Sequence, residues 1–223
     1  MSVLVIAGSK GGPGKTTVAR ALCAELAKQE VGFAVVDADP TLALHRWVTS
    51  IYEGSPFRCE PQANEDRLAH LLDDLRKVFP LVLVDTPGFH NLASSVAIAS
   101  ADAVLVPCRS SEPDLYEARA TAMKVRALST ASRREIPVRI LLNGVRGTGV
   151  AAHAAAEIKA AGLDRLTVTL GHRAAYEEMT HTGRAPHTGE AWREIDRLVD
   201  ELRELGWLPD VRTDVKTAVR GVV

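Results

Sequence analysis

Residues 8–17 read GSKGGPGKTT and directly follow the apolar run Val3–Ala7. An apolar strand that leads into a glycine-rich turn, and then into Lys-Thr-Thr, predicts a loop that wraps around phosphate groups. Gly11, Gly12 and Gly14 allow the backbone to bend so that its N–H groups point inward, and a helix that begins near Gly14 adds the positive end of its dipole. The stretch therefore predicts a phosphate-binding loop at the first strand–helix junction.

The polar residues of this loop have separate predicted roles. We expect Lys15 to reach β- and γ-phosphates, the Thr16 hydroxyl to ligate Mg²⁺, and Thr17 to bond an α-phosphate. The strict pattern GxxxxGK[ST] has glycine where this chain has Ser9. Lys10 is a second lysine, five residues before Lys15, and phosphate binding in one subunit does not require it.

Outward from this loop, short apolar runs alternate with helical patterns along the chain. The runs are nearly continuous and rich in β-branched residues, which is typical of strands buried on both faces of a parallel sheet. Strand–helix alternation predicts right-handed crossovers, and therefore an α/β fold of three layers with a doubly wound, mostly parallel sheet. The predicted strands are Val3–Ala7, Phe33–Val36, Leu81–Val84, Ala103–Val106, Val138–Leu142 and Leu166–Leu170, and the predicted helices are Thr16–Gln29, Glu65–Val78, Asn91–Ser100, Pro113–Leu128, Val150–Ala160 and Glu190–Leu205.

Length and composition favour a single domain. The 223 residues, 46% of them hydrophobic, are enough to bury one sizeable core. We predict one P-loop domain over residues 1–208 and a C-terminal tail over residues 209–223. The stretch Tyr52–Asn64 is interrupted by prolines and glycine, so we expect it to be a surface excursion.

Composition also restricts the compartment and the class of protein. The net charge is −1, which is unlike that of a basic protein that coats nucleic acid. The sequence shows no apolar run of 18 residues and no basic leader, so we expect neither a membrane span nor a signal peptide. Cys23, Cys59 and Cys108 are widely spaced, and we expect reduced thiols rather than disulfides or zinc ligands.

Carboxylates follow the second and third predicted strands, as DADP (residues 37–40) and DTPG (85–88). The carboxyl ends of parallel strands meet at one edge of a sheet, where ligands bind. We expect Asp85 to hold Mg²⁺ through water, and the segment that follows it to respond to a terminal phosphate. For Asp37 two interpretations stay open: support of the metal's water ligands, or a buried turn.

Together the motifs resemble those of the ParA/MinD superfamily of deviant Walker A P-loop ATPases. KGGPGKTT (residues 10–17) is similar to the signature KGGxGKTT, and VVDADP (35–40) is similar to the second motif. LVLVDTPG (81–88) resembles the Walker B strand, and LLNGV (141–145) resembles the strand whose asparagine meets the base. The similarity covers about the whole chain, including TVTLGHRAAYEEMTHTGRAP (167–186), and is greatest to small ParF-like partition proteins.

Two positions depart from the family pattern. Thr41 stands where glutamine usually follows DxDP, and Gly88 stands where the Walker B strand more often ends in Pro-Pro. Both lie in segments that are expected to respond to the nucleotide.

The resemblance implies a role for Lys10. In this family two ATP-loaded subunits face each other, and each signature lysine reaches the phosphates of the other subunit, where it neutralises charge in the transition state. The resemblance further implies that Asp39 positions the attacking water and that Asn143 bonds the adenine. The implied cofactors are ATP and Mg²⁺. The implied catalytic residues are Lys10, Lys15 and Asp39; the ATP-binding residues are Lys10, Gly11, Gly12, Pro13, Gly14, Lys15, Thr16, Thr17 and Asn143; and the metal-binding residues are Thr16, Asp39 and Asp85.

The function that the resemblance implies is that of a ParA-like ATPase. Such a protein forms an ATP-dependent sandwich homodimer, binds nonspecific DNA, and partitions or positions a plasmid, a chromosome or another cargo. A ParB-like or adaptor partner stimulates its weak ATP hydrolysis. The implied location is cytoplasmic and nucleoid-associated.

Two alternatives stay open. The first is a MinD-like membrane-associated switch ATPase, but the valines of the tail are weak anchors and Asp210 and Asp214 oppose an anionic surface, so we do not expect a membrane partner. The second is a metabolic P-loop ligase, although the chain shows no substrate-specific group of residues. A reductase like the nitrogenase iron protein is disfavoured because the three cysteines do not match a shared cluster.

Charge is unevenly distributed along the chain. The span Arg119–Arg173 has ten Lys or Arg residues against three acids, a net +7, which leaves the rest of the chain at −8. A one-sided basic region suits sequence-independent DNA contacts, but ordinary solvated helix faces would give the same count. Arg173 aligns with an arginine of the family in the turn before a late helix, and the resemblance implies that it serves either ATP or DNA. The DNA-binding candidates are Arg133, Arg134, Arg139, Arg165 and Arg173.

Overall fold

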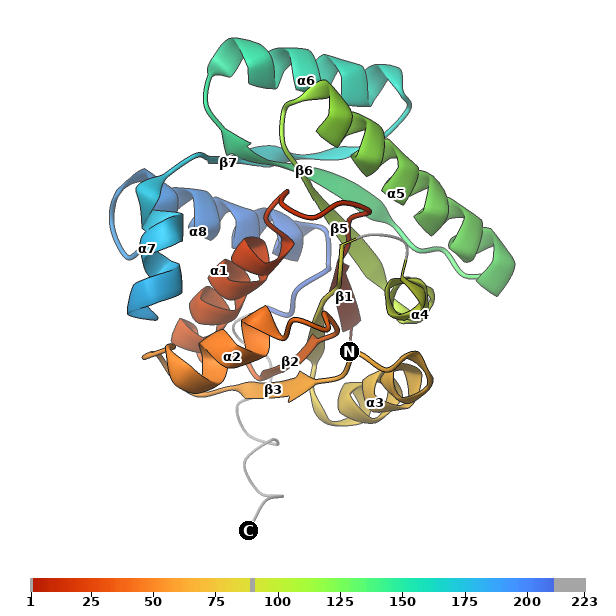
Figure 1. Ribbon diagram of the computed structural model, residues 1–223, viewed down its shortest axis with the longest axis vertical. Helices are drawn as coiled ribbons and strands as arrows, with labels where there is room; N and C mark the ends of the chain where they lie inside the picture. Colours follow the sequence, from red (N-terminus) through yellow and green to blue (C-terminus); the bar gives the residue numbers. More distant parts are fainter. Residues whose placement is uncertain (1, 89–90, 211–223) are drawn as a thin grey trace.

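The structure, a computed structural model shown in Figure 1, describes residues 2–88 and 91–210. In this part of the chain, seven strands form one sheet in the order β3-β2-β4-β1-β5-β6-β7, and neighbouring strands run parallel. The predicted α/β fold is thereby confirmed. The strands are β1 (Ser2–Ile6), β2 (Phe33–Asp37), β3 (Arg58–Pro61), β4 (Leu81–Asp85), β5 (Ala103–Cys108), β6 (Val138–Val145) and β7 (Arg165–Gly171), and the helices are α1 (Lys15–Lys28), α2 (Ala43–Ser50), α3 (Glu65–Val78), α4 (Leu92–Ser100), α5 (Glu112–Ser132), α6 (Thr148–Ala160), α7 (Ala174–Thr182) and α8 (Gly189–Glu204).

Helices cover both faces of the sheet, which gives the three predicted layers (Figure 1). α1, α2, α7 and α8 pack on one face around buried residues such as Trp47 and Leu198. α3, α4, α5 and α6 pack on the other face around residues such as Leu72. Successive side chains of a strand point to opposite faces, so Leu4 of β1 enters the first cluster and Val5 enters the second.

Local sequence explains where a typical helix of this fold begins and which face it buries. α3 is preceded by Asn64, whose side chain accepts a hydrogen bond from the backbone N–H of Arg67. Leu68, Leu72 and Leu75 recur at helical spacing and are all buried. The structure places this helix over the residues that periodicity predicts.

The strand β3 and the helices α2 and α7 are not among the elements predicted from the apolar runs and helical patterns. The span Tyr52–Asn64, predicted to be a surface excursion, contains the strand β3. This strand lies at the edge of the sheet and its residues are exposed or half-buried, so it needs no apolar run. α2 has eight residues and buries only Leu44 and Trp47, which is too short a pattern to indicate a helix.

The carboxyl ends of β1, β2 and β4 meet at one edge of the sheet. Ile6 of β1 and Asp37 of β2 are both register partners of Asp85 on β4. The loop of residues 8–14 leaves β1 at this edge and is the red segment near the middle of Figure 1. The fold therefore brings the three polar motifs together, as the parallel sheet predicted.

The described chain ends shortly after α8. Trp207 and Leu208 are buried in the core cluster that includes residues of α1 and α8. The predicted tail of residues 209–223 lies outside the described residues from position 211 onward. Among the described helices, none combines the length and the apolar character that crossing a membrane requires.

Candidate nucleotide site

The loop between β1 and α1 has the backbone shape of a phosphate-binding turn. Gly12 and Gly14 have φ angles of 96° and 94°, in the left-handed region that favours glycine. A Cβ on Gly14 would also collide with the side-chain amide of Asn143. α1 begins at Lys15, and no side chain in the described part of the protein caps it, so among these residues its amino end is open to an anion.

Lys15 is buried at the start of α1, and its ammonium donates a hydrogen bond to the carbonyl oxygen of Lys10 at 3.0 Å. Burial lowers the pKa of Lys15, while the carboxylates of Asp85 and Asp39 raise it. The Lys15 ammonium therefore lies at the opening of its own loop. The charges of Asp85, at the end of β4, and of Asp39, after β2, act on it. This is the place from which a P-loop lysine meets phosphate oxygens.

Asp85 ends β4 as a buried carboxylate, and neither of its oxygens has a hydrogen-bond partner among the described residues. Burial raises the pKa of Asp85 to about 7, and Asp37 and Asp39 add to the rise. The Thr16 hydroxyl, which is near the carboxylate but does not meet hydrogen-bond geometry, opposes the rise, as does Lys15. A buried carboxylate without donors is costly, and hydrated Mg²⁺ would supply both donors and positive charge. The residues present therefore fit a magnesium ion held by Thr16 and, through water, by Asp85.

The structure supports the second interpretation of Asp37, in which its carboxylate stabilises a buried turn. Its carboxylate is fully buried and accepts hydrogen bonds from the backbone N–H groups of Asp39, Leu44 and His45 at 3.1, 2.9 and 2.9 Å. Burial raises the pKa of Asp37 and these three donors lower it. Asp37 therefore anchors the turn before α2 and the first turn of that helix, and so positions the segment that carries Asp39.

Asp39 lies half-buried in that turn. One carboxylate oxygen accepts a hydrogen bond from the backbone N–H of Thr41 at 2.8 Å. The charge of Asp39 acts on both Lys15 and Asp85, so the three groups share one site. Arg20 of α1 also contacts the start of α2, because its guanidinium donates a hydrogen bond to the carbonyl oxygen of Ala43 at 2.8 Å. Sequence reasoning missed Arg20, which lies one helical turn after Thr16.

The loop after β4 packs directly on the P-loop. A Cβ on Gly88 would lie 2.8 Å from the backbone nitrogen of Gly11 and 3.0 Å from the carbonyl carbon of Lys10. Only glycine permits this approach without displacement. Thr86 fastens the start of the same loop, because its hydroxyl donates to the carbonyl oxygen of Ile6 at 2.9 Å. A segment predicted to respond to the terminal phosphate therefore touches the phosphate loop itself.

The start of the P-loop is fastened to α5. The Ser9 hydroxyl donates to the Glu117 carboxylate at 2.6 Å, and the Ser9 backbone N–H donates to the Thr121 hydroxyl at 3.0 Å. The ammonium of Lys10 lies 3.2 Å from the Asp114 carboxylate on the same helix. The departure from glycine at position 9 thus has a structural use. Sequence reasoning did not find these α5 partners, because acids on an amphipathic helix are indistinguishable from an ordinary solvated face.

A cavity of about 370 Å³ adjoins the P-loop on the side of α7. Asn143 lines it, and its amide nitrogen donates to the carbonyl oxygen of Pro13 at 2.7 Å, which leaves the amide oxygen to accept from a base. The position suits the base and ribose of a nucleotide whose phosphates lie in the loop. Further lining residues that the sequence did not single out are Arg109, His172, Tyr176, Glu177 and His181.

The five arginines predicted to contact DNA occupy two separate places. Arg133 and Arg134 end α5, Arg139 begins β6 and Arg165 begins β7, so these four lie toward the amino ends of the strands. Arg173 lies at the opposite edge, beside the cavity.

Three of these arginines are ion-paired. Arg134 pairs with Asp102 at 2.8 Å, and Arg139 pairs with Asp164 at 2.6 Å. Arg173 pairs with Glu194 at 2.5 Å. Neither Asp102 nor Glu194 belongs to the span whose net charge is +7, so the fold neutralises part of the basic excess with acids from elsewhere in the chain.

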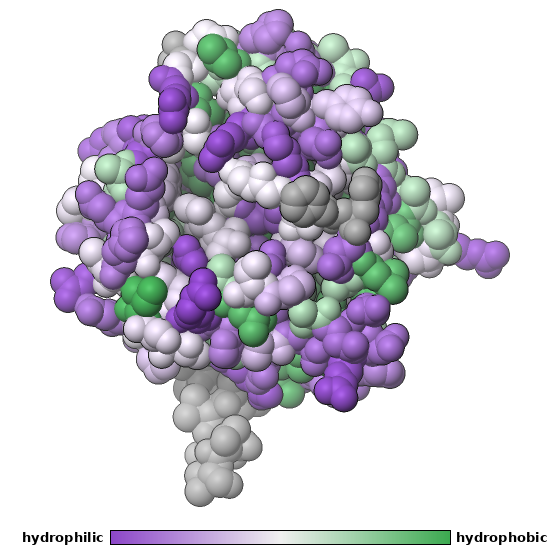
Figure 2. Space-filling view, viewed as in Figure 1, coloured by the Kyte–Doolittle hydropathy of each residue, from purple (hydrophilic) through white to green (hydrophobic). Residues whose placement is uncertain are grey.

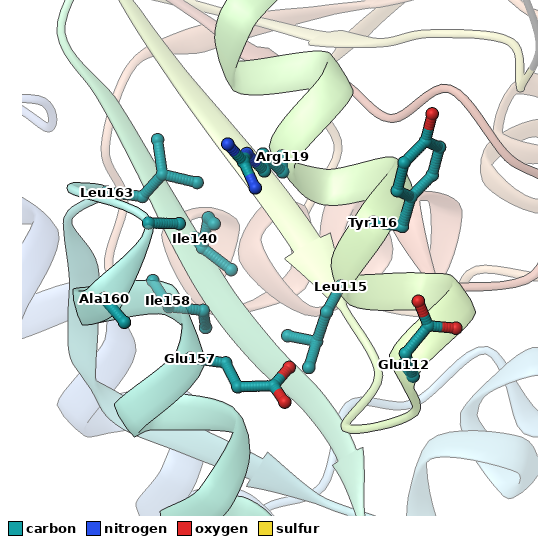
Figure 3. Close-up of a pocket in the computed structure, with 10 residues that line it drawn as sticks. Glu112, Leu115, Tyr116, Arg119, Ile140, Glu157, Ile158, Ala160 and Leu163 are labelled. Carbon is teal, nitrogen blue, oxygen red and sulfur yellow. The ribbon is translucent and has the colours of Figure 1, made fainter.

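A second hollow, of about 430 Å³, lies between α5 and α6 (Figure 3). Leu115, Ile158 and Leu163 contribute apolar surface, and the guanidinium of Arg119 points into the space between the helices. Its lining residues come from α5, β6, α6 and the turn after α6, and none comes from the P-loop. The hollow is therefore separate from the nucleotide site.

The P-loop, the second lysine beside it and the carboxylates at neighbouring strand ends define the fold and site of a P-loop protein of the ParA/MinD superfamily. More specifically, the chain belongs to the VirC1 family, because the family model described as VirC1 protein matches residues 1–193. Protein virC1 of Rhizobium radiobacter is 32% identical over 146 residues, which are 63% of this chain and 63% of that protein. The match thus spans less than two thirds of that relative's own length.

Two further comparisons place the chain in the wider superfamily. Protein ParA of Rhizobium radiobacter is 27% identical over 192 residues, which are 84% of this chain and 86% of that protein. Among solved structures, the ATP complex of a Cyanothece McdA variant superposes with a TM-score of 0.77 at 19% identity, and covers 94% of this chain and 98% of that chain. At this identity the structural likeness concerns the fold.

Proposed function

We propose that this protein is a ParA-like ATPase whose two subunits close around ATP and Mg²⁺. The observation that carries the proposal is the meeting of Lys10, Lys15, Asp39 and Asp85 at one edge of the sheet. Lys15 and the open end of α1 bind the triphosphate within one subunit. Lys10 is superfluous for that task, and its side chain is 45% exposed at the mouth of the loop.

Hydrolysis in this proposal depends on positioning and electrostatics. Asp39, held by the turn that Asp37 anchors, orients the attacking water at the γ-phosphate. Lys15 and the partner subunit's copy of Lys10 neutralise the charge that develops on the phosphate oxygens. Thr16 and, through water, Asp85 would hold Mg²⁺, which would supply positive charge to stabilise the negative charge of the phosphates. None of these groups is a strong base, so slow turnover that a partner protein accelerates is the expected behaviour.

Pairing would occur through the face that carries the P-loop. Figure 2 shows that this face is mostly hydrophilic, with hydrophobic residues scattered over it rather than gathered in one patch. A face of this kind does not favour permanent association, because stable obligate interfaces are more apolar. ATP, bound by groups of both subunits, would supply the missing attraction. Assembly would therefore report which nucleotide is bound.

We further propose that the ATP-bound homodimer binds nonspecific DNA and is used to partition or position a cargo, with hydrolysis stimulated by a ParB-like or adaptor partner. Membership in the VirC1 family and the similarity to protein ParA support this assignment. So does the similarity to a protein named for the maintenance of carboxysome distribution, which is 28% identical over 209 residues. Dimerisation would double the basic surface and thus strengthen salt-sensitive DNA contacts.

Sedimentation of an Asp39→Ala variant tests the central step. This change leaves the phosphate loop intact but slows hydrolysis, so we expect dimers with Mg-ATP and monomers with Mg-ADP or without nucleotide. A variant that stays monomeric with saturating Mg-ATP at high protein concentration would contradict the proposal.

Co-sedimentation with DNA and with anionic liposomes, each with and without ATP at two salt concentrations, separates a DNA-bound ATPase from a membrane-bound switch. Binding to neither would favour a metabolic enzyme.

A further inference from the structure

A buried carboxylate behind the base cavity gathers four hydrogen bonds. Glu194 of α8 has a side chain that is only 8% exposed. One of its oxygens accepts from the backbone N–H of Gly171 at 3.1 Å and from the Tyr176 hydroxyl at 2.9 Å. The other accepts from Nε of Arg173 at 2.9 Å and from a terminal guanidinium nitrogen of Arg173 at 2.5 Å. One side chain thus fastens the end of β7, the following turn and the first turns of α7.

All three partners of Glu194 line the cavity beside the P-loop, whereas Glu194 itself does not. The wall they form is packed closely. A Cβ on Gly171 would lie 3.0 Å from the Arg173 guanidinium, so the guanidinium lies against a residue that has no side chain. Tyr176 is 7% exposed, and burial, together with the charge of Glu194, raises the pKa of its hydroxyl.

We propose that Glu194 is a positioning residue for nucleotide binding, which acts through Gly171, Arg173 and Tyr176 on the base and ribose but not on the phosphates. The proposal rests on the nucleotide site proposed above. Without the carboxylate, the Gly171 N–H loses its partner, the buried Tyr176 hydroxyl keeps only its longer contact of 3.3 Å with the carbonyl oxygen of Ala191, and Arg173 is free to leave the wall. In the unchanged protein this wall of the cavity is ordered before the nucleotide binds. In the variant, binding would have to order it, and that cost lowers the affinity for nucleotide.

The chain offers a matched control on the same helix. Glu201 lies two turns beyond Glu194 and also ties α8 to β7, because its carboxylate accepts from the backbone N–H groups of Thr167 and Val168 at 2.6 and 2.8 Å. Neither of these partners lines the cavity. Replacing Glu201 therefore removes a helix–strand link of the same kind without disturbing the wall of the base cavity.

The test is calorimetric titration of Glu194→Gln, Glu201→Gln and the unchanged protein with Mg-ATP and with inorganic tripolyphosphate, which can contact only the phosphate loop. We expect Glu194→Gln to bind Mg-ATP about tenfold more weakly and tripolyphosphate within about twofold of the unchanged protein. Glu201→Gln should bind both as the unchanged protein does. In steady-state assays Glu194→Gln should raise KM for ATP and leave kcat within about twofold.

Equal weakening of Mg-ATP and tripolyphosphate by Glu194→Gln would mean general damage to the fold and would overturn the proposal, as would unchanged binding of Mg-ATP. Tyr176→Phe removes a single hydroxyl and serves if Glu194→Gln does not fold; it should weaken Mg-ATP about threefold and spare tripolyphosphate. Unchanged Mg-ATP binding by Tyr176→Phe would then overturn the proposal. An unchanged protein that binds neither probe would instead refute the nucleotide site itself.

Discussion

The ammonium of Lys10 in the P-loop lies 3.2 Å from a carboxylate oxygen of Asp114, in the first turn of α5. The Lys10 side chain is 45% exposed and that of Asp114 is 12% exposed, so the lysine is held within its own subunit while it faces solvent. A partly exposed pair of this kind stabilises the fold by about 0–1 kcal/mol. The contact is therefore weak enough for Lys10 to exchange Asp114 for the triphosphate of a facing subunit.

Lys10→Ala should leave ATP binding by the single subunit intact, because Lys15 and α1 make that contact. It should reduce hydrolysis by on the order of 10³-fold, since cationic groups supplied across an interface contribute this much to phosphoryl transfer. The measurements are ATP turnover and ATP-dependent sedimentation, with Lys28→Ala at the far end of α1 as the control. Near-normal turnover together with normal dimer formation in Lys10→Ala would remove the main support for the proposed function.

Asp114→Ala should strengthen ATP-dependent dimerisation, because Lys10 no longer has to leave a partner before it crosses. The gain should not exceed about fivefold, which corresponds to the small energy of the pair. Ser111→Ala is the matched control: the Ser111 hydroxyl donates to the other Asp114 oxygen at 2.5 Å, and its loss leaves the lysine contact in place. The measurement is the dimer dissociation constant with Mg-ATP in the Asp39→Ala background. Weaker dimerisation of the Asp114 variant would show that Asp114 serves the interface instead.

The sequence predicted the parts of the site that follow from strand ends. Asp37 and Asp85 each terminate an apolar run, and parallel pairing makes them register partners, so their proximity could be deduced before any coordinates. The edge strand β3 could not be deduced, because it is partly exposed and carries no apolar run. Nor could the role of Asp37 be deduced, since two of the three N–H groups from which it accepts hydrogen bonds, those of Leu44 and His45, belong to a helix too short to be predicted.

Charge counting along the chain cannot show which basic residues are paired, for a different physical reason. The span Arg119–Arg173 has a surplus of seven positive charges, but Arg134 and Arg173 pair with Asp102 and Glu194, which lie before and after that span. Ion pairs form between residues that the fold brings together, and a linear count has no access to them. The pairing of Lys10 with Asp114 was invisible for the same reason.

Gly88→Ala should disturb the phosphate loop without introducing unusual backbone angles. The added methyl group would lie 2.8 Å from the backbone nitrogen of Gly11, so the loop after β4 or the P-loop has to move. Overpacking of this kind costs about 1–3 kcal/mol of stability, and we expect weaker Mg-ATP binding as well. Gly147→Ala is the control, because no atom of residues 2–88 or 91–210 lies within 4 Å of a Cβ there. Equal effects of both changes in urea unfolding and ATP titration would contradict this prediction.

Asp85→Asn should stabilise the metal-free protein above pH 7. Burial raises the pKa of Asp85 to about 7 from an ordinary value of 3.8, so between these values the native carboxyl keeps a proton that the unfolded chain releases. Stability that this group contributes is therefore lost as the pH rises from about 4 to about 7. Asparagine cannot ionise, so the variant should gain about 1–4 kcal/mol at pH 8 and progressively less toward pH 4.

Urea unfolding at several pH values, with chelator and with excess Mg²⁺ plus ATP, measures this effect. Magnesium with ATP should stabilise the unchanged protein strongly and Asp85→Asn weakly, because the ion compensates the buried charge only where that charge exists. A gain that does not depend on pH would show that the gain does not come from the ionisation of Asp85. Equal stabilisation of both proteins by Mg²⁺ and ATP would place the metal elsewhere.

The five candidate arginines should differ in their contribution to DNA binding according to their partners. In the described residues, Arg133 and Arg165 form no ion pair with an acid, whereas Arg134, Arg139 and Arg173 are each held by a carboxylate. A phosphate contact from a paired arginine requires that the pair be broken, so the two other arginines should contribute most. The double change Arg133→Glu and Arg165→Glu should therefore weaken ATP-dependent binding to nonspecific duplex DNA by at least about tenfold at moderate salt.

The salt dependence of binding distinguishes direct phosphate contacts from a general change of charge. Each phosphate contact that the dimer loses should reduce the magnitude of the slope of log affinity against log salt concentration by about 1. Arg67→Glu, an exposed reversal on α3, serves as the control for net charge and should leave the slope unchanged. ATP-dependent sedimentation of the double variant must first show normal dimers. Normal DNA affinity with an unchanged slope would then show that the amino ends of β6 and β7 are not part of the DNA-binding surface. The edge of the sheet that carries the P-loop would become the next candidate.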